Sequence, residues 1–232
     1  MKPQDNPASK LEKVRERIAD SASRYARDPG EITLIAVAKG QADSAMRALA
    51  DAGQRHFGEN YLQEAMAHQQ ALADMALCWH FIGPLQSNKT RDIAARFDWV
   101  HSIDRLRIAR RLDSQRPETL PPLNICLQIN ISGEQSKAGI SLAELPALTA
   151  EVARLPRLRL RGLMAIPAPA GDEASRREPC RQLCEALELL NNEGYKLDVL
   201  SMGMSGDLEA AIAEGATHVR VGTALFGPRA QH

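Results

Sequence analysis

The chain has 232 residues, a length that suits one large α/β domain, and 44% of the residues are hydrophobic although only 4% are aromatic. Its 29 basic and 29 acidic side chains balance, so no net charge favours nucleic acid or an anionic membrane. The amino terminus is polar, and no apolar stretch approaches the length that spans a bilayer. We therefore expect neither nucleic acid nor a membrane as a partner, and we predict a cytoplasmic protein.

The first predicted element is a helix at about 7–27. Asn6-Pro7 is typical of an N-cap followed by proline at the first helical position, and apolar residues then recur at helical spacing. Asp28-Pro29-Gly30 ends this helix. Short apolar runs then alternate with helical patterns to the end of the chain, which predicts alternating strands and helices.

The runs predicted as strands are mostly apolar and short, and they are Ile32–Ala38, Arg55–Gly58, Cys78–Ile82, Trp99–Ser102, Leu123–Ile131, Leu160–Ile166, Val199–Met202 and Thr217–Gly222. The predicted helices between them are Ser44–Ala52, Tyr61–Ala73, Lys89–Arg96, Arg105–Ser114, Leu142–Arg154, Glu173–Asn192 and Gly206–Ala213. Gly53, Gly194 and Gly215 follow helical runs, where a left-handed C-cap is expected.

This alternation predicts a parallel sheet, and eight such units in one α/β domain favour a closed (β/α)8 TIM barrel. We expect a single domain over residues 1–232, with the barrel at about 32–227 after the N-terminal helix. An open doubly wound sheet is the alternative. No Gly-x-Gly-x-x-Gly turn follows the first strand, which weakens the dinucleotide-binding form of that alternative.

Lys39 closes the first predicted strand, and Gly40 follows it. An amine held at the end of a buried strand loses hydration, which favours the neutral form that attacks a carbonyl group. The carboxyl ends of barrel strands converge on one mouth, so polar residues after the other strands would meet Lys39 there. Taken alone, a solvated lysine at a strand end is the simpler interpretation.

Two segments near the end of the chain suit a phosphate. Leu200-Ser-Met-Gly-Met-Ser-Gly-Asp207 and Val219-Arg-Val-Gly-Thr223 carry small residues and hydroxyls after predicted strands, where backbone amides approach an anion closely. The candidate phosphate ligands are Ser201, Ser205, Gly222 and Thr223. An amine nucleophile and a phosphate site together suggest pyridoxal phosphate (PLP) held as a Schiff base, although a plain Gly/Ser loop gives a similar pattern.

Arg220 shares one side of the last predicted strand with His218, and it points either into the barrel or toward the helices. If it points inward, its guanidinium could donate to a pyridine nitrogen, because it carries donors only. The alternative is an arginine paired with a carboxylate at a helix edge.

The remaining reactive residues give no second site. The cysteines form no C-x-x-C pair and are expected as reduced thiols; they are Cys78, Cys126, Cys180 and Cys184. No His/Cys/Asp/Glu group has structural-zinc spacing, and no Gly-x-Ser-x-Gly elbow occurs, so we expect no metal. His80 and His101 each lie among apolar neighbours and are expected as core histidines.

Taken in order, several segments closely resemble the pyridoxal phosphate homeostasis protein family, which is related to the barrel domain of bacterial alanine racemases. The matching segments are Leu34-Ile-Ala-Val-Ala-Lys39, Phe57-Gly-Glu-Asn-Tyr61, Trp79-His-Phe-Ile-Gly-Pro-Leu-Gln-Ser-Asn-Lys89, Gly162-Leu-Met-Ala-Ile166, Leu200-Ser-Met-Gly-Met-Ser-Gly-Asp207 and Val219-Arg-Val-Gly-Thr-Ala-Leu-Phe-Gly227. The resemblance covers nearly the whole chain and implies the TIM-barrel fold.

The resemblance also implies a set of PLP contacts: Lys39 as the internal aldimine, Asn60 beside the ring, Arg220 at the pyridine nitrogen, and Ser201, Ser205, Gly222 and Thr223 at the phosphate. It implies a carrier or regulator that buffers PLP, delivers it to apo PLP-dependent enzymes and maintains vitamin B6 homeostasis. Such a protein has no established catalytic reaction, so no residue is assigned a catalytic role.

Two other functions stay open. A racemase needs an acid or base on each face of the substrate α-carbon. Lys39 serves one face, and alanine racemases take a tyrosine for the other from a carboxyl-terminal domain that we expect this chain to lack. Only Tyr61 is placed to reach the mouth, so a low-efficiency amino-acid racemase or lyase is the alternative, and an interaction scaffold is the third. Because the racemase dimer depends partly on that domain, we expect a monomer.

Overall fold

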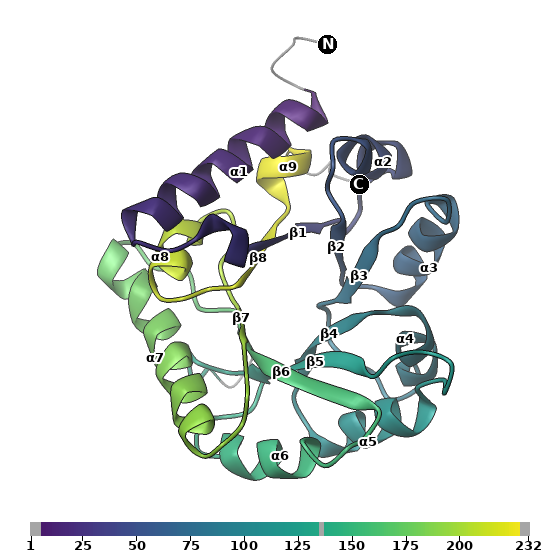
Figure 1. The fold of residues 1–232 in the computed structure, drawn as a ribbon, viewed down its shortest axis with the longest axis vertical. Coiled ribbons are helices and arrows are strands. Elements are labelled where there is room, and N and C mark those ends of the chain that lie inside the picture. Colours follow the sequence, from purple (N-terminus) through teal and green to yellow (C-terminus); the bar gives the residue numbers. More distant parts are fainter. Residues whose placement is uncertain (1–5, 135–136, 228–232) are drawn as a thin grey trace.

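The computed structural model describes residues 6–134 and 137–227 and shows a closed barrel of parallel strands that pair in chain order, with the last strand beside the first (Figure 1). The strands are β1 Thr33–Val37, β2 His56–Glu59, β3 Cys78–Phe81, β4 Trp99–Ile103, β5 Leu123–Ile129, β6 Leu158–Ala165, β7 Val199–Ser201 and β8 His218–Val221. The outermost residues of the predicted 1–232 domain, 1–5 and 228–232, lie outside the described residues. The TIM-barrel prediction is confirmed, and the open-sheet alternative is wrong.

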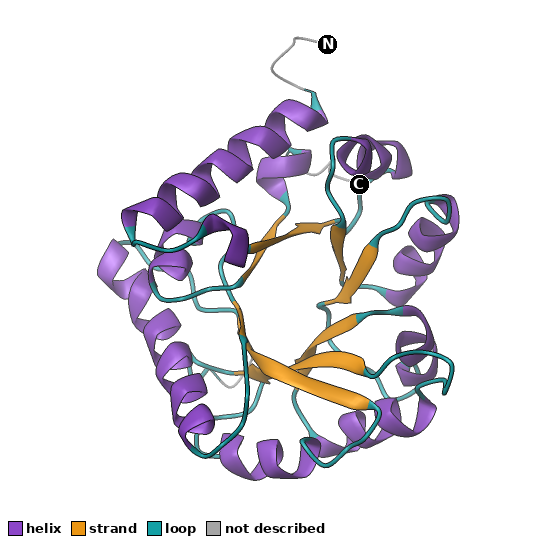
Figure 2. Ribbon diagram, in the orientation of Figure 1, coloured by secondary structure: helices purple, strands orange, loops and turns teal. Residues whose placement is uncertain are grey.

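The helices surround the strands as an outer ring (Figure 2). They are α1 Pro7–Arg24, α2 Asp43–Asp51, α3 Leu62–Ala71, α4 Thr90–Arg96, α5 Leu106–Gln115, α6 Leu145–Val152, α7 Glu173–Asn192, α8 Leu208–Ala213 and α9 Thr223–Phe226, with a 3-10 helix η2 at Pro29–Glu31. The short elements η2 and α9 were not predicted. Among the described helices, none combines the length and the apolar character that crossing a membrane requires.

Strand residues alternate between two environments, as the pleat of a strand requires. Leu34 and Ala36 on β1, and Ala38 just after it, belong to the large apolar cluster between the strands and the helices. The other β1 residues face the inside of the barrel. We call the apolar cluster between the strands and the helices the outer core.

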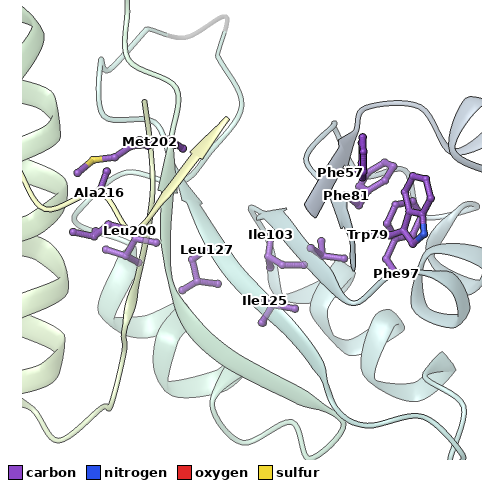
Figure 3. Close-up of a cluster of buried hydrophobic side chains, with 14 of the residues drawn as sticks. Phe57, Trp79, Phe81, Phe97, Ile103, Ile125, Leu127, Leu200, Met202 and Ala216 are labelled. Carbon is purple, nitrogen blue, oxygen red and sulfur yellow. The ribbon is translucent and has the colours of Figure 1, made fainter. Parts of the chain in front are cut away.

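Large side chains fill the outer core (Figure 3). Phe57, Trp79 and Phe81 come from β2 and β3, and Phe97 follows α4. The rings of Phe81 and Phe97 meet edge to face, with centroids 5.3 Å apart, an arrangement that aromatic pairs prefer. Leu112 on α5 is completely buried in the same cluster.

Inside the barrel the packing is different. A small second cluster contains Trp99, Cys126, Met164 and Val199. Branched aliphatic side chains usually fill a TIM barrel, whereas this interior also holds buried polar side chains, namely His80, His101, Ser201, His218 and Arg220. We call this second region the barrel interior.

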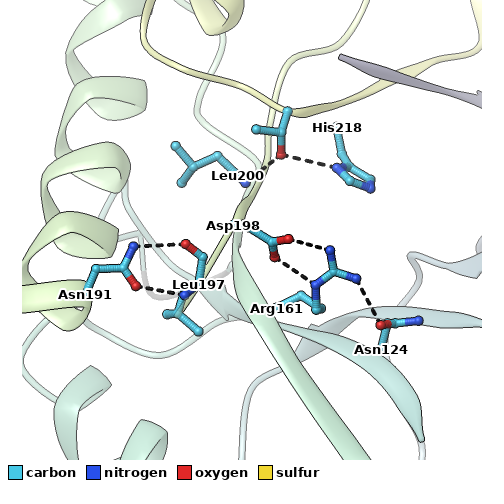
Figure 4. A network of polar contacts seen from close by, with 8 residues as sticks. Asn124, Arg161, Asn191, Leu197, Asp198, Leu200 and His218 are labelled. Carbon is cyan, nitrogen blue, oxygen red and sulfur yellow. Dashed lines mark hydrogen bonds and ion pairs between the residues drawn. The ribbon is translucent and has the colours of Figure 1, made fainter. Parts of the chain in front are cut away.

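An ion pair joins Arg161, within β6, to Asp198, the residue before β7 (Figure 4). Arg161 donates to both carboxylate oxygens of Asp198, at 2.7 and 2.5 Å, and to Asn124 at 3.2 Å. The same guanidinium lies 5.0 Å from the ring centroid of Trp99, a cation–π contact. Charged groups therefore cover the apolar cluster of the barrel interior at this end.

Helix α1 joins the first and the last parts of the chain, because it lies across α8 and α9 (Figure 1). Arg17 pairs with Glu209 on α8 at 2.7 Å. Arg27 donates to the carbonyl oxygens of Ile212 and Ala216, at 2.9 and 2.8 Å. Helix α1 therefore lies on the outside of the barrel where β1 and β8 pair (Figure 1).

Candidate functional site

Lys39 lies two residues beyond the end of β1, on the side of the strand that faces the barrel interior. Its Nζ lies 4.8 Å from the centroid of the Tyr61 ring. The chain turns directly after it, since Gly40 has a φ of +66°, a conformation that glycine adopts without steric cost. Lys39 thus stands at the mouth of the barrel, where the sequence predicted it.

Helix α3 holds the turn that follows Lys39. The backbone N–H of Gly40 donates to the carboxylate of Glu64 at 3.0 Å, and Nε2 of His68 lies 3.2 Å from the carbonyl oxygen of Gln41. His68 Nδ1 also contacts Oε1 of Glu59, at 2.6 Å. Burial raises the pKa of Glu59, and the hydrogen bond with Glu59 raises the pKa of His68, so this pair retains a proton.

Asn60 stands level with Lys39 on the neighbouring strand end, because Val37 pairs with Gly58 and both residues lie two positions further on. Its Oδ1 is buried and has no hydrogen-bond partner. A buried acceptor without a donor costs about 1–3 kcal/mol, so this atom is suited to a ligand. A cavity of about 270 Å³ adjoins it, lined also by Gln128 and Asn130.

A close backbone contact holds Asn60. A Cβ atom on Gly83 would lie 2.1 Å from the carbonyl oxygen of Asn60, a distance that no side chain tolerates. Glycine at position 83 therefore lets the loop after β3 pack directly against the backbone that carries Asn60.

Of the predicted phosphate residues, Ser205 precedes β8 in the chain, and Gly222 and Thr223 directly follow it. Gly222 follows β8, which pairs with β1, and a Cβ on Gly222 would lie 3.5 Å from Val37 Cβ. Thr223 is exposed and begins α9, where the first N–H groups of a helix lack partners within the helix. Ser205 lies in the turn before α8 that begins with Gly203, whose φ is +93°. The structure therefore brings Gly222 and Thr223 beside the end of β1.

Arg220 points into the barrel interior, which decides between the two directions that the sequence left open. It donates to Ser201 Oγ at 2.7 Å and to the carbonyl oxygen of Ala165 at 2.9 Å, and it is 4% exposed. Burial lowers its pKa to about 10, so the guanidinium remains charged at neutral pH. Both bonds fix the orientation of a donor-only group.

Ser201 is the last residue of β7 and is fully buried. Its hydroxyl accepts from Arg220 and lies 2.8 Å from Nδ1 of His101. The sequence predicted a phosphate contact for Ser201, whereas the structure places its hydroxyl in contact with Arg220 and a histidine. Whether the hydroxyl proton is free for an anion depends on the tautomer of His101.

The sequence predicts His80 and His101 as separate core residues, whereas in the structure they belong to one hydrogen-bonded series. His56 Nδ1 lies 2.9 Å from His80 Nε2, and His80 Nδ1 lies 2.9 Å from His101 Nε2. Their spacing in the sequence gives no sign of this, because the contacts depend on the register of β2, β3 and β4.

His56, Cys78 and His80 form a group whose ligand atoms lie within 4.8 Å of one another. The sequence spacing did not indicate it. The two histidine nitrogens that face each other already share a hydrogen bond, and burial raises the pKa of Cys78 to about 12. Because a thiol must lose its proton to bind a metal, these contacts favour a hydrogen-bonded group.

Four kinds of group meet at the mouth. Lys39 supplies an amine, and Asn60 supplies a buried acceptor without a partner. Gly222 and the hydroxyl of Thr223 lie beside them, and the guanidinium of Arg220 lies below. An amine reacts with an aldehyde, and donor groups of this kind suit a phosphate and a ring nitrogen. The residues present therefore fit PLP.

Comparisons with known proteins agree with this fit. The family model described as alanine racemase, N-terminal domain, matches residues 10–230. The chain is 57% identical to the pyridoxal phosphate homeostasis protein of Pseudomonas aeruginosa over 222 residues, covering 96% of this chain and 95% of that one. It is also 57% identical to the Escherichia coli K12 protein of the same name over 225 residues, covering 96% of each.

A solved structure extends the comparison to a bound ligand. The structure of PipY from Synechococcus elongatus with PLP bound has a TM-score of 0.80 and 40% identity to this chain. The match covers 90% of this chain and all of PipY.

Proposed function

The chain belongs to the pyridoxal phosphate homeostasis protein family, and from that premise we propose that it binds PLP reversibly through Lys39 and buffers or delivers it in vitamin B6 homeostasis. One observation carries the proposal. Lys39, the partnerless Oδ1 of Asn60 and the small residue Gly222 meet at the ends of three adjacent strands, β1, β2 and β8. PLP bound to PipY supports the choice of ligand.

In the proposed site the Lys39 amine condenses with the PLP aldehyde and releases water, and hydrolysis reverses the step. The backbone and hydroxyl groups of Ser205, Gly222 and Thr223 bind the phosphate, Ser201 contributes its hydroxyl, and Asn60 lies beside the ring. PLP supplies an electron sink when it is bound. Arg220 at the ring nitrogen can donate but cannot protonate it readily, so that sink is weak.

Reversible binding is what a carrier requires. We propose that the protein acts as a cytoplasmic monomer and passes PLP to apo-enzymes, with no catalytic reaction of its own. To test delivery, the PLP-loaded protein is incubated with an apo-enzyme, and reactivation is compared with that by an equal concentration of free PLP. Reactivation no faster than with free PLP would count against delivery.

The Lys39 assignment has a direct test. We expect Lys39→Ala to abolish the visible absorbance band of bound PLP, because no other residue is proposed to form the imine. Lys196→Ala, which alters an exposed lysine before β7, should keep the band. Borohydride reduction followed by peptide mass spectrometry should place the adduct on Lys39, and an adduct on another lysine would refute the assignment.

A low-efficiency racemase is the second candidate, and the contact between Lys39 and Tyr61 favours keeping it. The Tyr61 ring lies 4.8 Å from the Lys39 amine and is about half exposed, so a second acid–base group stands near the first. Incubation of amino acids in deuterated water distinguishes the two functions. Deuterium incorporation at the α-carbon by the wild-type protein, together with its loss in Tyr61→Phe, would favour the racemase. No deuterium incorporation by the wild-type protein would favour the carrier.

A further inference from the structure

A continuous series of hydrogen bonds connects Arg220 with the opposite end of the barrel interior. From Arg220 it passes through Ser201 Oγ, His101 and His80 to His56, with distances of 2.7, 2.8, 2.9 and 2.9 Å. His80, His101 and Ser201 are fully buried. His56 is partly exposed and lines a surface cavity of about 530 Å³ near α1.

The two central histidines use both ring nitrogens in this series. Burial and neighbouring groups lower the pKa of His80 and of His101 well below the ordinary value, so each ring carries one N–H at neutral pH. A neutral imidazole donates from one nitrogen and accepts at the other. If His101 accepts at Nδ1 it must donate from Nε2, and the same order is then imposed on His80.

Only two arrangements satisfy every contact. In the first, Ser201 donates to His101, and all three histidines carry their proton on Nε2. In the second, all three carry it on Nδ1, and His101 donates to Ser201. The Ser201 oxygen then accepts from both Arg220 and His101, so its own proton is free for another acceptor.

We propose that these three histidines act as one unit with two tautomeric states, and that an anion bound at Ser201 selects the second state. The inference rests on the proposed function, because that function supplies the phosphate. His101 and His80 are positioning residues: they determine whether Ser201 is a donor toward the mouth.

Protons balance in the change from the first state to the second. The hydroxyl proton of Ser201 passes to His101 Nδ1, the Nε2 proton of His101 passes to His80, and the Nε2 proton of His80 passes to His56. His56 releases its Nε2 proton to solvent in the cavity that it lines. A water molecule that enters the mouth with the anion supplies the proton that Ser201 has lost. The net charge of the barrel interior is therefore the same in both states.

Nitrogen-15 NMR of histidine-labelled protein tests the proposal, since the two tautomers give opposite assignments of protonated and unprotonated ring nitrogens. Spectra are recorded for the free protein, with inorganic phosphate and with PLP. We expect one shared tautomer for His56, His80 and His101 in the free protein, and a change of all three to the Nδ1-protonated form with either probe. Different tautomers among the three, or no change with either probe, would overturn the proposal.

Two variants test whether the tautomers of the three histidines are coupled to one another or respond only to their immediate neighbours. His80→Phe keeps an aromatic ring against Trp99, with which His80 is stacked at a centroid distance of 5.6 Å, but it interrupts the series. We expect His56 to stop responding to PLP while the visible PLP band remains. A response of His56 in this variant would overturn the coupling.

The second variant, Ser201→Ala, removes the hydroxyl that links the anion to His101. We expect the histidine response to disappear and the Kd for inorganic phosphate to rise about tenfold, and a preserved response would overturn the proposal. Failure of the proposed function would be recognised by a different observation, namely the absence of a PLP band in the wild-type protein. In that case the NMR spectra of the free and the phosphate-bound protein still test the tautomeric inference.

Discussion

The wall of the barrel separates the apolar outer core, exemplified by Phe57, Phe97 and Leu112, from a barrel interior that holds three buried histidines, Ser201 and Arg220. The outer core is continuous around the strands and the helices. The barrel interior holds only a small apolar cluster, and beside it runs a series of individual hydrogen bonds from His56 to Arg220.

The two faces of each strand therefore contribute differently: the outer face mainly stabilises the fold, and the inner face mainly orients polar groups. Burial of apolar area stabilises the fold without regard to direction. Hydrogen bonds in the barrel interior contribute less net stability but fix the orientation of donors and acceptors. Changes in the outer core should therefore alter the free energy of unfolding, and changes at the interior or the mouth should alter titration or ligand binding.

The largest expected effect on stability comes from the outer core. Leu112→Ala removes a completely buried side chain on α5 and should lower the free energy of unfolding by about 2–5 kcal/mol. Leu189→Ala, at a leucine that is 65% exposed, should change it by less than about 0.5 kcal/mol. Urea denaturation measures both. Loss of the PLP band in folded Leu112→Ala protein would contradict this difference between the two faces.

The barrel interior should respond to acid. Burial, with smaller contributions from nearby positive charge, lowers the pKa of His218 to about 4. Below pH 6.5 the unfolded chain binds a proton that the folded one does not, so the stabilisation is lost as the pH falls from about 6.5 to 4. Because one pKa unit corresponds to about 1.36 kcal/mol, His218 alone should account for about 3 kcal/mol.

Urea denaturation of wild-type protein and of His218→Gln, at pH 7 and at pH 4, isolates this contribution. The wild-type protein should lose about 3 kcal/mol more than the variant between the two pH values. Equal losses would show that His218 is not the buried neutral group that its surroundings indicate.

The mouth should be sensitive to backbone displacement. In Gly83→Ala the new Cβ would lie 2.1 Å from the Asn60 carbonyl oxygen, so the backbone must shift, at a cost of about 1–3 kcal/mol. PLP affinity should also fall, because Asn60 moves relative to Lys39. Gly171→Ala, whose new Cβ would meet no atom within 4 Å, is the matched control, and equal PLP affinity in both variants would argue against a role for Asn60.

The smallest expected effect concerns the pair behind Lys39. The hydrogen bond with Glu59 raises the pKa of His68 above 6.5, so its stabilisation is present below pH 6.5 and is lost as the pH rises through the raised value. The difference in free energy of unfolding between wild type and His68→Gln, measured by urea denaturation, should thus shrink from pH 6 to pH 9. A difference that grows with pH would reverse the assignment.

The strands were predictable because each is a short apolar run between turn residues, and every predicted strand end lies within two residues of the observed one. Gly53, Gly194 and Gly215 indeed have positive φ values of +91°, +100° and +94°. Helix α9 was missed because four residues are too few to show a helical period. The 3-10 helix η2 was missed for the same reason, within a segment that we interpreted as a helix end.

The site was predictable only in part. The rule that strand ends converge brought Lys39, Asn60 and Gly222 together from the sequence alone. The direction of Arg220 required the structure, since alternation along a strand gives two faces but not which face is inside. The histidine series required it too, because its contacts depend on the register between strands, and register leaves no local pattern in the residues.

The contacts of α1 with α8 and α9 have a consequence for synthesis on the ribosome. The first helix and first strand find their partners in the last segments of the chain, with Arg27 bound to the carbonyl oxygens of Ile212 and Ala216. An emerging chain therefore exposes an unpaired β1 edge and the apolar face of α1 until nearly all residues have been translated. Such late ring closure raises the mean sequence separation of contacting residues, and this separation slows folding.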